Sequence, residues 1–212
     1  VVEEQQEKVR VSGKNIERFL GKKKFRPDMA NAENEIGIVR GLAWTQVGGD
    51  TLEIEVNIMP GEVNLILTGQ LGDVMQESAR IALSYVRSIV KKEASYFKEH
   101  DIHLHVPEGA VPKDGPSAGV TMSTALYSAI EGIPVDAKVA MTGEVTLRGK
   151  VLPIGGLKEK LLAAKSAGIK KVLVPQENKP DVEELEEEIT DGIQIVFVTK
   201  VKQVLKESLV KR

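Results

Sequence analysis

The chain has 212 residues, of which 42% are hydrophobic and 28% charged, a composition typical of a globular domain that buries its own core. Its formal net charge of -2 gives no basic footprint for nucleic acid, and no apolar run approaches the roughly 20 residues of a membrane-spanning helix. Because the sequence holds no cysteine, disulfides, thiolate metal sites and cysteine nucleophiles are excluded.

The amino-terminal segment is charged and helix-like and ends in a loop-like tract, KKKFRPDMANAEN. It lacks the basic-then-apolar form of a signal peptide, so we expect an intracellular, cytoplasmic protein. The first residue is Val rather than Met, which indicates a piece of a longer protein; a native arm processed at its start is the alternative. We predict a helical arm or linker at 1–34 and one domain at 35–212.

The first half of this domain predicts strands followed by a long helix. Alternating apolar residues in TLEIEVNIMPG and turns at GGD and PG predict a meander of two or three strands between residues 35 and 69. Asp73 is the predicted N-cap of a helix that runs to about His100, with Gln76 completing a capping box. IHLHV, residues 102–106, predicts the next strand.

The second half alternates between helices and strands. The predicted elements are a small-residue helix at 117–131, strands at 139–141 and 145–152, a helix at 157–167 ended by Gly168, strand VLVP, a helix after Pro180, strand IQIVFV and a helix from about Lys200. The acidic run EELEEE is expected to be a solvated helix face. This order predicts an α/β or mixed α+β sandwich.

One serine lies in a glycine-rich stretch, VPKDGPSAGVTM, that places Ser117 between Gly115 and Gly119. The spelling matches the G-x-S-x-G elbow of α/β-hydrolases, but their histidine follows the serine, and all three histidines here precede it. That fold is therefore excluded. His103 and His105 share one face of the predicted strand, an arrangement that suits two ligands of a metal ion. Because the sequence indicates no third ligand nearby, a structural role is favoured.

The other route to an activated serine is a lysine whose pKa, about 10.4 in water, is lowered by burial. The candidate segment is GGLKEKLLAAKSAG, residues 155–168. At 100° per residue, Lys160 falls on the small, apolar side of the helix with Leu161 and Ala164, whereas Lys158 falls near its edge. This pattern favours Lys160 as the base; a lysine that snorkels from the helix edge is the alternative.

The turn before the serine has two interpretations. Backbone N–H groups around Asp114 and Gly115, together with the start of a helix, would stabilise an oxyanion, although Pro116 cannot donate. The same loop suits a phosphate, but no G-x-x-x-x-G-K-[ST] motif occurs, so we predict no nucleotide cofactor and no metal in this chain.

The motifs PEGAVPKDGPSAG, MTGEVTLRGKVLPIGGLKEK and GLAWTQVGGD together resemble the proteolytic domain of the ATP-dependent protease Lon. The resemblance is continuous from about Glu35 to the carboxyl end. It implies an α+β fold similar to the ribosomal-protein domain 2-like fold, first named in a small-subunit ribosomal protein. It also implies a serine endopeptidase whose Ser-Lys dyad is Ser117 and Lys160.

The same resemblance implies supporting residues. Thr142 and Glu144 in MTGE match family positions beside the dyad, where a threonine hydroxyl would orient the lysine; a plain strand-end residue is the alternative for Thr142. Asp114 matches a position discussed as regulating the site, and a turn-forming role is its alternative.

The resemblance further implies partners. Lon proteases are homohexameric rings that degrade misfolded and regulatory proteins in protein quality control, and an AAA+ ATPase module that uses ATP and Mg precedes the protease. VVEEQQEKVRVSGKNIERFLG resembles the end of that module, and the chain lacks a Walker motif. Two alternatives stay open: a catalytically silent ring-forming scaffold, and an amidase or esterase acting on small substrates.

Overall fold

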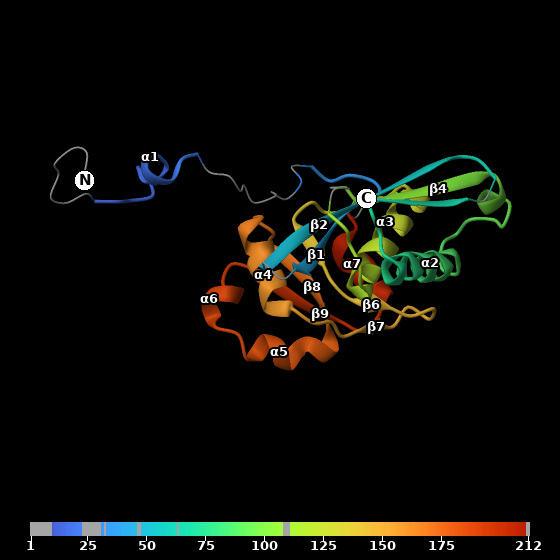
Figure 1. Cartoon of the computed structure of the whole chain (residues 1–212). Helices are drawn as coiled ribbons and strands as arrows, with labels where there is room; N and C mark the ends of the chain where they lie inside the picture. Colours follow the sequence, from blue (N-terminus) through green and yellow to red (C-terminus); the bar gives the residue numbers. More distant parts are fainter. Residues whose placement is uncertain are drawn as a thin grey trace.

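The computed structural model describes residues 10–22, 31, 33–45, 48–62, 64–107 and 111–210. Its centre is a mixed sheet in the order β3-β4-β2-β1-β5-β8-β9, and β6 and β7 form a separate small sheet (Figure 1). The strands are β1 (Ile38–Thr45), β2 (Gly48–Pro60), β3 (Leu65–Thr68), β4 (His100–His105), β5 (Val139–Met141), β6 (Glu144–Val145), β7 (Val151–Leu152), β8 (Lys171–Pro175) and β9 (Gln194–Val198). Strands β1, β5, β8 and β9 run parallel, whereas β2 is antiparallel to both β1 and β4.

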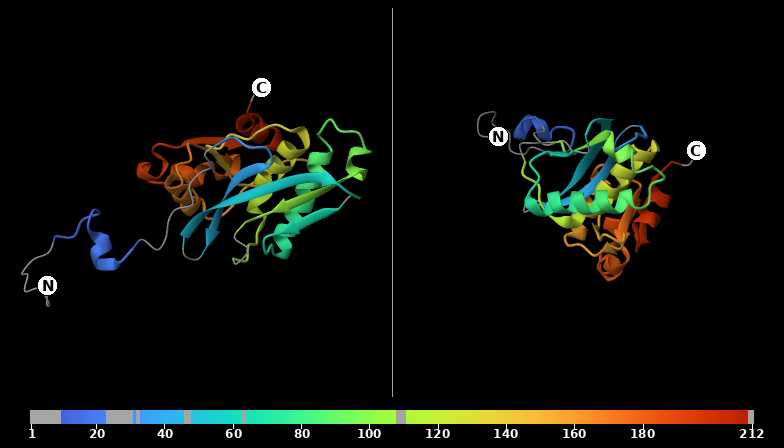
Figure 2. Two further views of the ribbon diagram at one scale, coloured as in Figure 1. Left: turned by 90° about the horizontal axis from the view of Figure 1, so that it is seen from above. Right: turned by 90° about the vertical axis from the view of Figure 1, so that its right-hand side faces the viewer.

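Helices cover both faces of the β1-β5-β8 part of this sheet. The α-helices of the described residues are α1 (Ile16–Leu20), which lies apart from the sheet in Figure 2, α2 (Asp73–Arg87), α3 (Gly119–Glu131), α4 (Leu157–Ser166), α5 (Lys179–Glu183), α6 (Glu187–Thr190) and α7 (Val201–Ser208). In Figure 1, α4, α5 and α6 lie on one side and α2 and α3 on the other. Among the described residues, no helix combines the length and apolar character needed to cross a membrane. The mixture of parallel and antiparallel strands with helices confirms the predicted α+β class.

The buried residues form two hydrophobic clusters, one on each face of the sheet. The α3 cluster joins apolar residues of α2, α3 and α7 to the strands, and the α4 cluster joins those of α4 and α6. Successive side chains of a strand point to opposite faces. In β5, accordingly, Met141 belongs to the α3 cluster and Ala140 to the α4 cluster.

The β1–β2 hairpin is held closely between α3 and α4. A Cβ at Gly41 in β1 would lie 2.9 Å from the Thr121 hydroxyl of α3, and a Cβ at Gly49 in β2 would lie 1.9 Å from the Glu159 carbonyl oxygen of α4. Glycine at these two positions lets both helices approach the backbone of the hairpin.

Part of the predicted meander is wrong. β1 and β2 form the expected hairpin, but β3 pairs with β4 in parallel, and β4 lies between β3 and β2. The sequence shows which segments alternate, whereas the insertion of a distant strand depends on tertiary packing.

The first long helix is shorter than predicted. α2 ends at Arg87, where the Ser88 hydroxyl donates to the Tyr85 carbonyl at 2.6 Å, and Phe97 is buried in a separate 3-10 turn, Tyr96–Lys98. Gly72, rather than Asp73, is the N-cap, and it has no side chain with which to cap the helix.

The predicted strand 145–152 is also wrong, because a turn divides it into β6 and β7. Gly149 has a φ of +70°, and its N–H donates to the Thr146 carbonyl at 2.8 Å. The predicted helix after Pro180 is instead two short helices, α5 and α6.

Much of the predicted arm lies outside the described residues, as do residues 108–110 of the predicted serine loop. Within the arm, α1 contributes no buried residue, and it lies apart from the sheet in Figure 2. The division at residue 34 stays a prediction.

Candidate active site

Ser117 lies in a 3-10 turn, Pro116–Ala118, that leads directly into α3. Its carbonyl oxygen accepts the Gly143 N–H at 2.8 Å and the Thr142 hydroxyl at 3.3 Å. Thr142 and Gly143 directly follow β5, so the serine turn is hydrogen-bonded to the carboxyl end of a central strand. That connection fixes the turn relative to the sheet.

Lys160 lies in the first turn of α4, where it is only 2% exposed, between Leu157 and Leu161 of the α4 cluster. Its Nζ is 3.0 Å from Ser117 Oγ and 3.1 Å from Thr142 Oγ1. Burial lowers the pKa of Lys160 from 10.5 to about 8, because the apolar surroundings penalise the ammonium form. About a tenth of Lys160 is therefore neutral at pH 7.

The serine and the lysine come from opposite faces of the sheet. Ser117 precedes α3 on one face, Lys160 belongs to α4 on the other, and they meet beyond the last residue of β5. The carboxyl ends of parallel strands are a common place for sites in proteins with such sheets. Thr142, which is fully buried, lies at this junction and contacts both partners.

Asp114 is held away from the lysine by two backbone groups. Its Oδ1 accepts the Met75 N–H at 2.9 Å and the Gly115 N–H at 2.8 Å. It therefore supplies the cap that α2 lacks in its own sequence, from a residue far along the chain. Gly72 allows this approach, since a Cβ there would lie 2.4 Å from Asp114 Cγ.

This contact changes the expectation for the oxyanion. The Gly115 N–H was a candidate donor, but in this structure it donates to the Asp114 carboxylate. Gly115 has a φ of +116°, a conformation that favours glycine. An oxyanion would need other donors, or a movement of Asp114.

The remaining sequence candidates have no hydrogen bond to Ser117 or Lys160 among those described. Glu144 begins β6, opposite Leu152, and is not among the residues that line the cavity described below. His103 and His105 lie on β4, and each has a ring nitrogen near the Thr68 hydroxyl. In the described part of the chain, no three His, Asp or Glu side chains are grouped closely enough to hold a metal ion.

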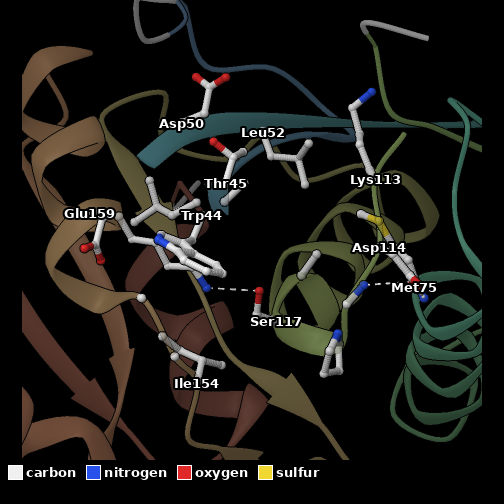
Figure 3. A pocket seen from close by; sticks show the side chains of 18 of the residues that line it. Trp44, Thr45, Asp50, Leu52, Met75, Lys113, Asp114, Ser117, Ile154 and Glu159 are labelled. Carbon is white, nitrogen blue, oxygen red and sulfur yellow. Dashed lines mark hydrogen bonds between the residues drawn. The ribbon is translucent and has the colours of Figure 1, made fainter. Parts of the chain in front are cut away.

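A cavity of about 680 Å³ opens over the dyad and is lined by β1, β2, the serine loop and the segment that enters α4. In Figure 3, Trp44 and Ile154 lie on one side of Ser117, and Met75 and Asp114 on the other. The dashed line to Ser117 in that view is the bond from Lys160.

Trp44, within the motif GLAWTQVGGD, is a cavity residue that the sequence patterns did not single out. The side chain is 57% exposed and lies against Gly156, where a Cβ would be 2.7 Å from Trp44 Cγ. It is the single tryptophan of the chain, and its exposure beside the dyad, which only the structure reveals, makes it part of the cavity wall.

Together, these features define a class of protein. A serine at a helix start, a buried lysine within hydrogen-bond distance of it and an open cavity above both are the arrangement of a hydrolase that uses a Ser-Lys dyad.

Comparison with known proteins narrows this class to one family. The model of the Lon protease (S16) C-terminal proteolytic domain matches residues 10–211, and the chain belongs to this family. It is 62% identical over 206 residues to a Lon protease of Lachnoclostridium phytofermentans, covering 96% of this chain and 26% of that protein. It is 51% identical over 213 residues to Lon protease 1 of Bacillus subtilis, covering 99% of this chain and 28% of that protein.

The chain therefore spans about a quarter of the length of the curated relatives it matches. Family membership confirms the predicted resemblance and the prediction of a serine peptidase.

Proposed function

We propose that this chain is the endopeptidase part of an ATP-dependent protease, with Ser117 as the nucleophile and Lys160 as the general base. The observation that carries this proposal is the 3.0 Å distance between Ser117 Oγ and the Nζ of a buried lysine. A lysine is a base only when it is neutral, and burial is the physical means of making it so.

The reaction begins when neutral Lys160 Nζ takes the proton of Ser117 Oγ as the oxygen attacks a peptide carbonyl. The resulting ammonium then donates a proton to the leaving amine, and water hydrolyses the acyl-enzyme. With a pKa of about 8, roughly a tenth of the lysine is neutral at pH 7. Thr142 Oγ1 accepts from Nζ and donates to the Ser117 carbonyl, so it orients the amine toward the serine.

The substrate is proposed to bind as an extended strand along β1. The pairing of β5 with β1 covers Arg40 and Gly41, whereas residues 42–45 continue beyond it and line the cavity. Their other side is already paired with β2. An extended peptide added to this edge would use backbone hydrogen bonds that do not depend on its sequence, which suits a protease of unfolded proteins.

The wider assembly is also part of the proposal. The resemblance, within the family that matches, supports misfolded and regulatory proteins as substrates, a cytoplasmic hexameric ring and a preceding AAA+ module whose end is the arm at 1–34. The sequence has no P-loop motif, so its residues do not fit ATP and Mg, and no step above passes through them. Sedimentation velocity of the chain would test the ring directly.

The test of the dyad is cleavage of an unfolded protein and of a fluorogenic peptide. Lys160→Gln should abolish both activities with an unchanged circular dichroism spectrum, whereas Lys158→Gln, altering an exposed lysine two residues away, should leave them intact. Substantial activity in a folded Lys160→Gln protein would refute the dyad.

A fluorophosphonate reagent separates the alternatives. Labelling of the wild-type chain at Ser117, lost in Ser117→Ala, is expected for a peptidase. Absence of both labelling and cleavage would favour the silent scaffold, and cleavage of simple esters without peptides would favour the amidase or esterase.

A further inference from the structure

The outer face of the β3–β4 edge carries a group of polar side chains that the dyad does not use. Along β4, Ile102 and Leu104 are buried in the α3 cluster, so His103 and His105 point to the opposite, partly exposed face. Neither histidine lines the catalytic cavity.

The two imidazoles converge on one point. His103 Nε2 lies 2.9 Å and His105 Nδ1 2.7 Å from the same atom, Thr68 Oγ1 on β3. The ring centroids are 6.4 Å apart, with the planes at 67° to each other. A hydroxyl has one proton, so it donates to at most one imidazole, and the other imidazole donates its N–H to the hydroxyl oxygen. That second ring must change tautomer before the same nitrogen can bind a metal ion.

The neighbouring positions add a carboxylate and no positive charge. The residues directly opposite the two histidines on the adjacent strands are Glu55 and Asn57 on β2 and Ile66 and Thr68 on β3. Glu55 faces His105, and directly opposed antiparallel residues have Cβ atoms roughly 5 Å apart. Its carboxylate is the candidate for a third ligand at this place.

We propose that His103 and His105 bind a divalent transition-metal ion such as Zn²⁺, with Glu55 or water completing the coordination. Neutral imidazole is the commonest protein ligand for such ions. At Zn–N distances of about 2.0–2.1 Å, two imidazoles on a tetrahedral ion have centroids roughly 5 Å apart. Closing the present 6.4 Å to that value needs only small side-chain rotations, with the ion replacing the Thr68 hydroxyl between the rings.

Within the described ranges, no three His, Asp or Glu side chains already lie close enough together to hold a metal ion. Binding would therefore require Glu55 or water to move next to the two histidines. The test is a calorimetric titration of the chain with ZnCl₂ alone. One equivalent should bind to the wild type, and His103→Gln or His105→Gln should each lower the affinity by about tenfold or more. Glu55→Gln should weaken binding less than either histidine variant.

The third histidine provides a matched control. His100 Nδ1 contacts the Tyr96 carbonyl at 2.8 Å and its ring stacks on Tyr96, so His100→Gln should bind Zn²⁺ like the wild type. No binding by the wild type at millimolar ZnCl₂ would overturn the proposal, and so would full binding by the His103→Gln, His105→Gln double variant.

A measurement on the unmodified chain makes the test independent of variant folding. Zinc should shift the imidazole NMR signals of His103 and His105 and leave those of His100 in place. Equal shifts in all three, or none, would refute the site.

Discussion

The burial of Lys160 makes a quantitative prediction about stability. The pKa of Lys160 falls from 10.5 to about 8 because its amine is desolvated, and the side chain is only 2% exposed. A tenfold change in proton affinity corresponds to about 1.4 kcal/mol. Holding the ammonium in the folded site therefore costs about 3 kcal/mol at pH 7, where both folded and unfolded chains are mostly protonated.

The sign of the pH dependence follows from proton binding. Between about pH 8 and 10.5 the unfolded chain keeps the proton and the folded chain releases it, so wild-type stability rises with pH in this window. The penalty is present in full below about pH 8 and disappears above 10.5. Lys160→Met keeps an unbranched side chain, shorter by one atom, that has no proton to lose.

The assay is urea unfolding of the wild type and Lys160→Met from neutral to alkaline pH. The variant should be more stable relative to the wild type at pH 7, and this difference should shrink by about 3 kcal/mol as the pH approaches 10.5. Other titrating groups are common to both proteins and cancel. Parallel stability curves would show that burial does not lower the pKa of this lysine.

Three further substitutions test the surroundings of the dyad. Thr142→Val removes the hydroxyl 3.1 Å from Lys160 Nζ, so kcat should fall about tenfold or more with KM little changed; an unaltered kcat would exclude the orienting role. Asp114→Ala removes the cap of α2 and should cost about 1 kcal/mol in urea unfolding, and no loss would mean that solvent replaces the cap. Gly149→Ala places a Cβ 2.2 Å from the Tyr85 ring at a φ of +70° and should cost about 2 kcal/mol or more by thermal unfolding; a wild-type midpoint would contradict the close packing.

The central elements of the fold could be predicted because the residue patterns that indicate them lie within each segment itself. The strand at 139–141 has the bounds of β5, and the helix predicted at 157–167 corresponds to α4, which ends one residue earlier. Helical periodicity also placed Lys160 on the buried side of α4, because neighbouring side chains on one helix face share their burial.

The errors involve interactions between distant segments. The cap of α2 comes from Asp114, which no pattern near Gly72 reveals, and β4 separates β3 from β2 although β3 follows β2 in the chain. The occupation of the Gly115 N–H by a carboxylate likewise depends on the folded loop. The role of Trp44 in the cavity could not be predicted, because a strand pattern does not show which of its side chains are exposed.

The position of the dyad between two hydrophobic clusters has a mechanical consequence. Ser117 adjoins Ala118 of the α3 cluster and Lys160 adjoins Leu161 of the α4 cluster, so their hydrogen bond joins the helical layers that pack on the two faces of the sheet. A shift of α3 relative to α4 by about 1 Å would separate these two atoms while leaving both helices folded, and misplacements of that size slow reactions about a hundredfold. The distance between Ser117 Oγ and Lys160 Nζ therefore depends on how α3 and α4 are aligned across the sheet that both pack against.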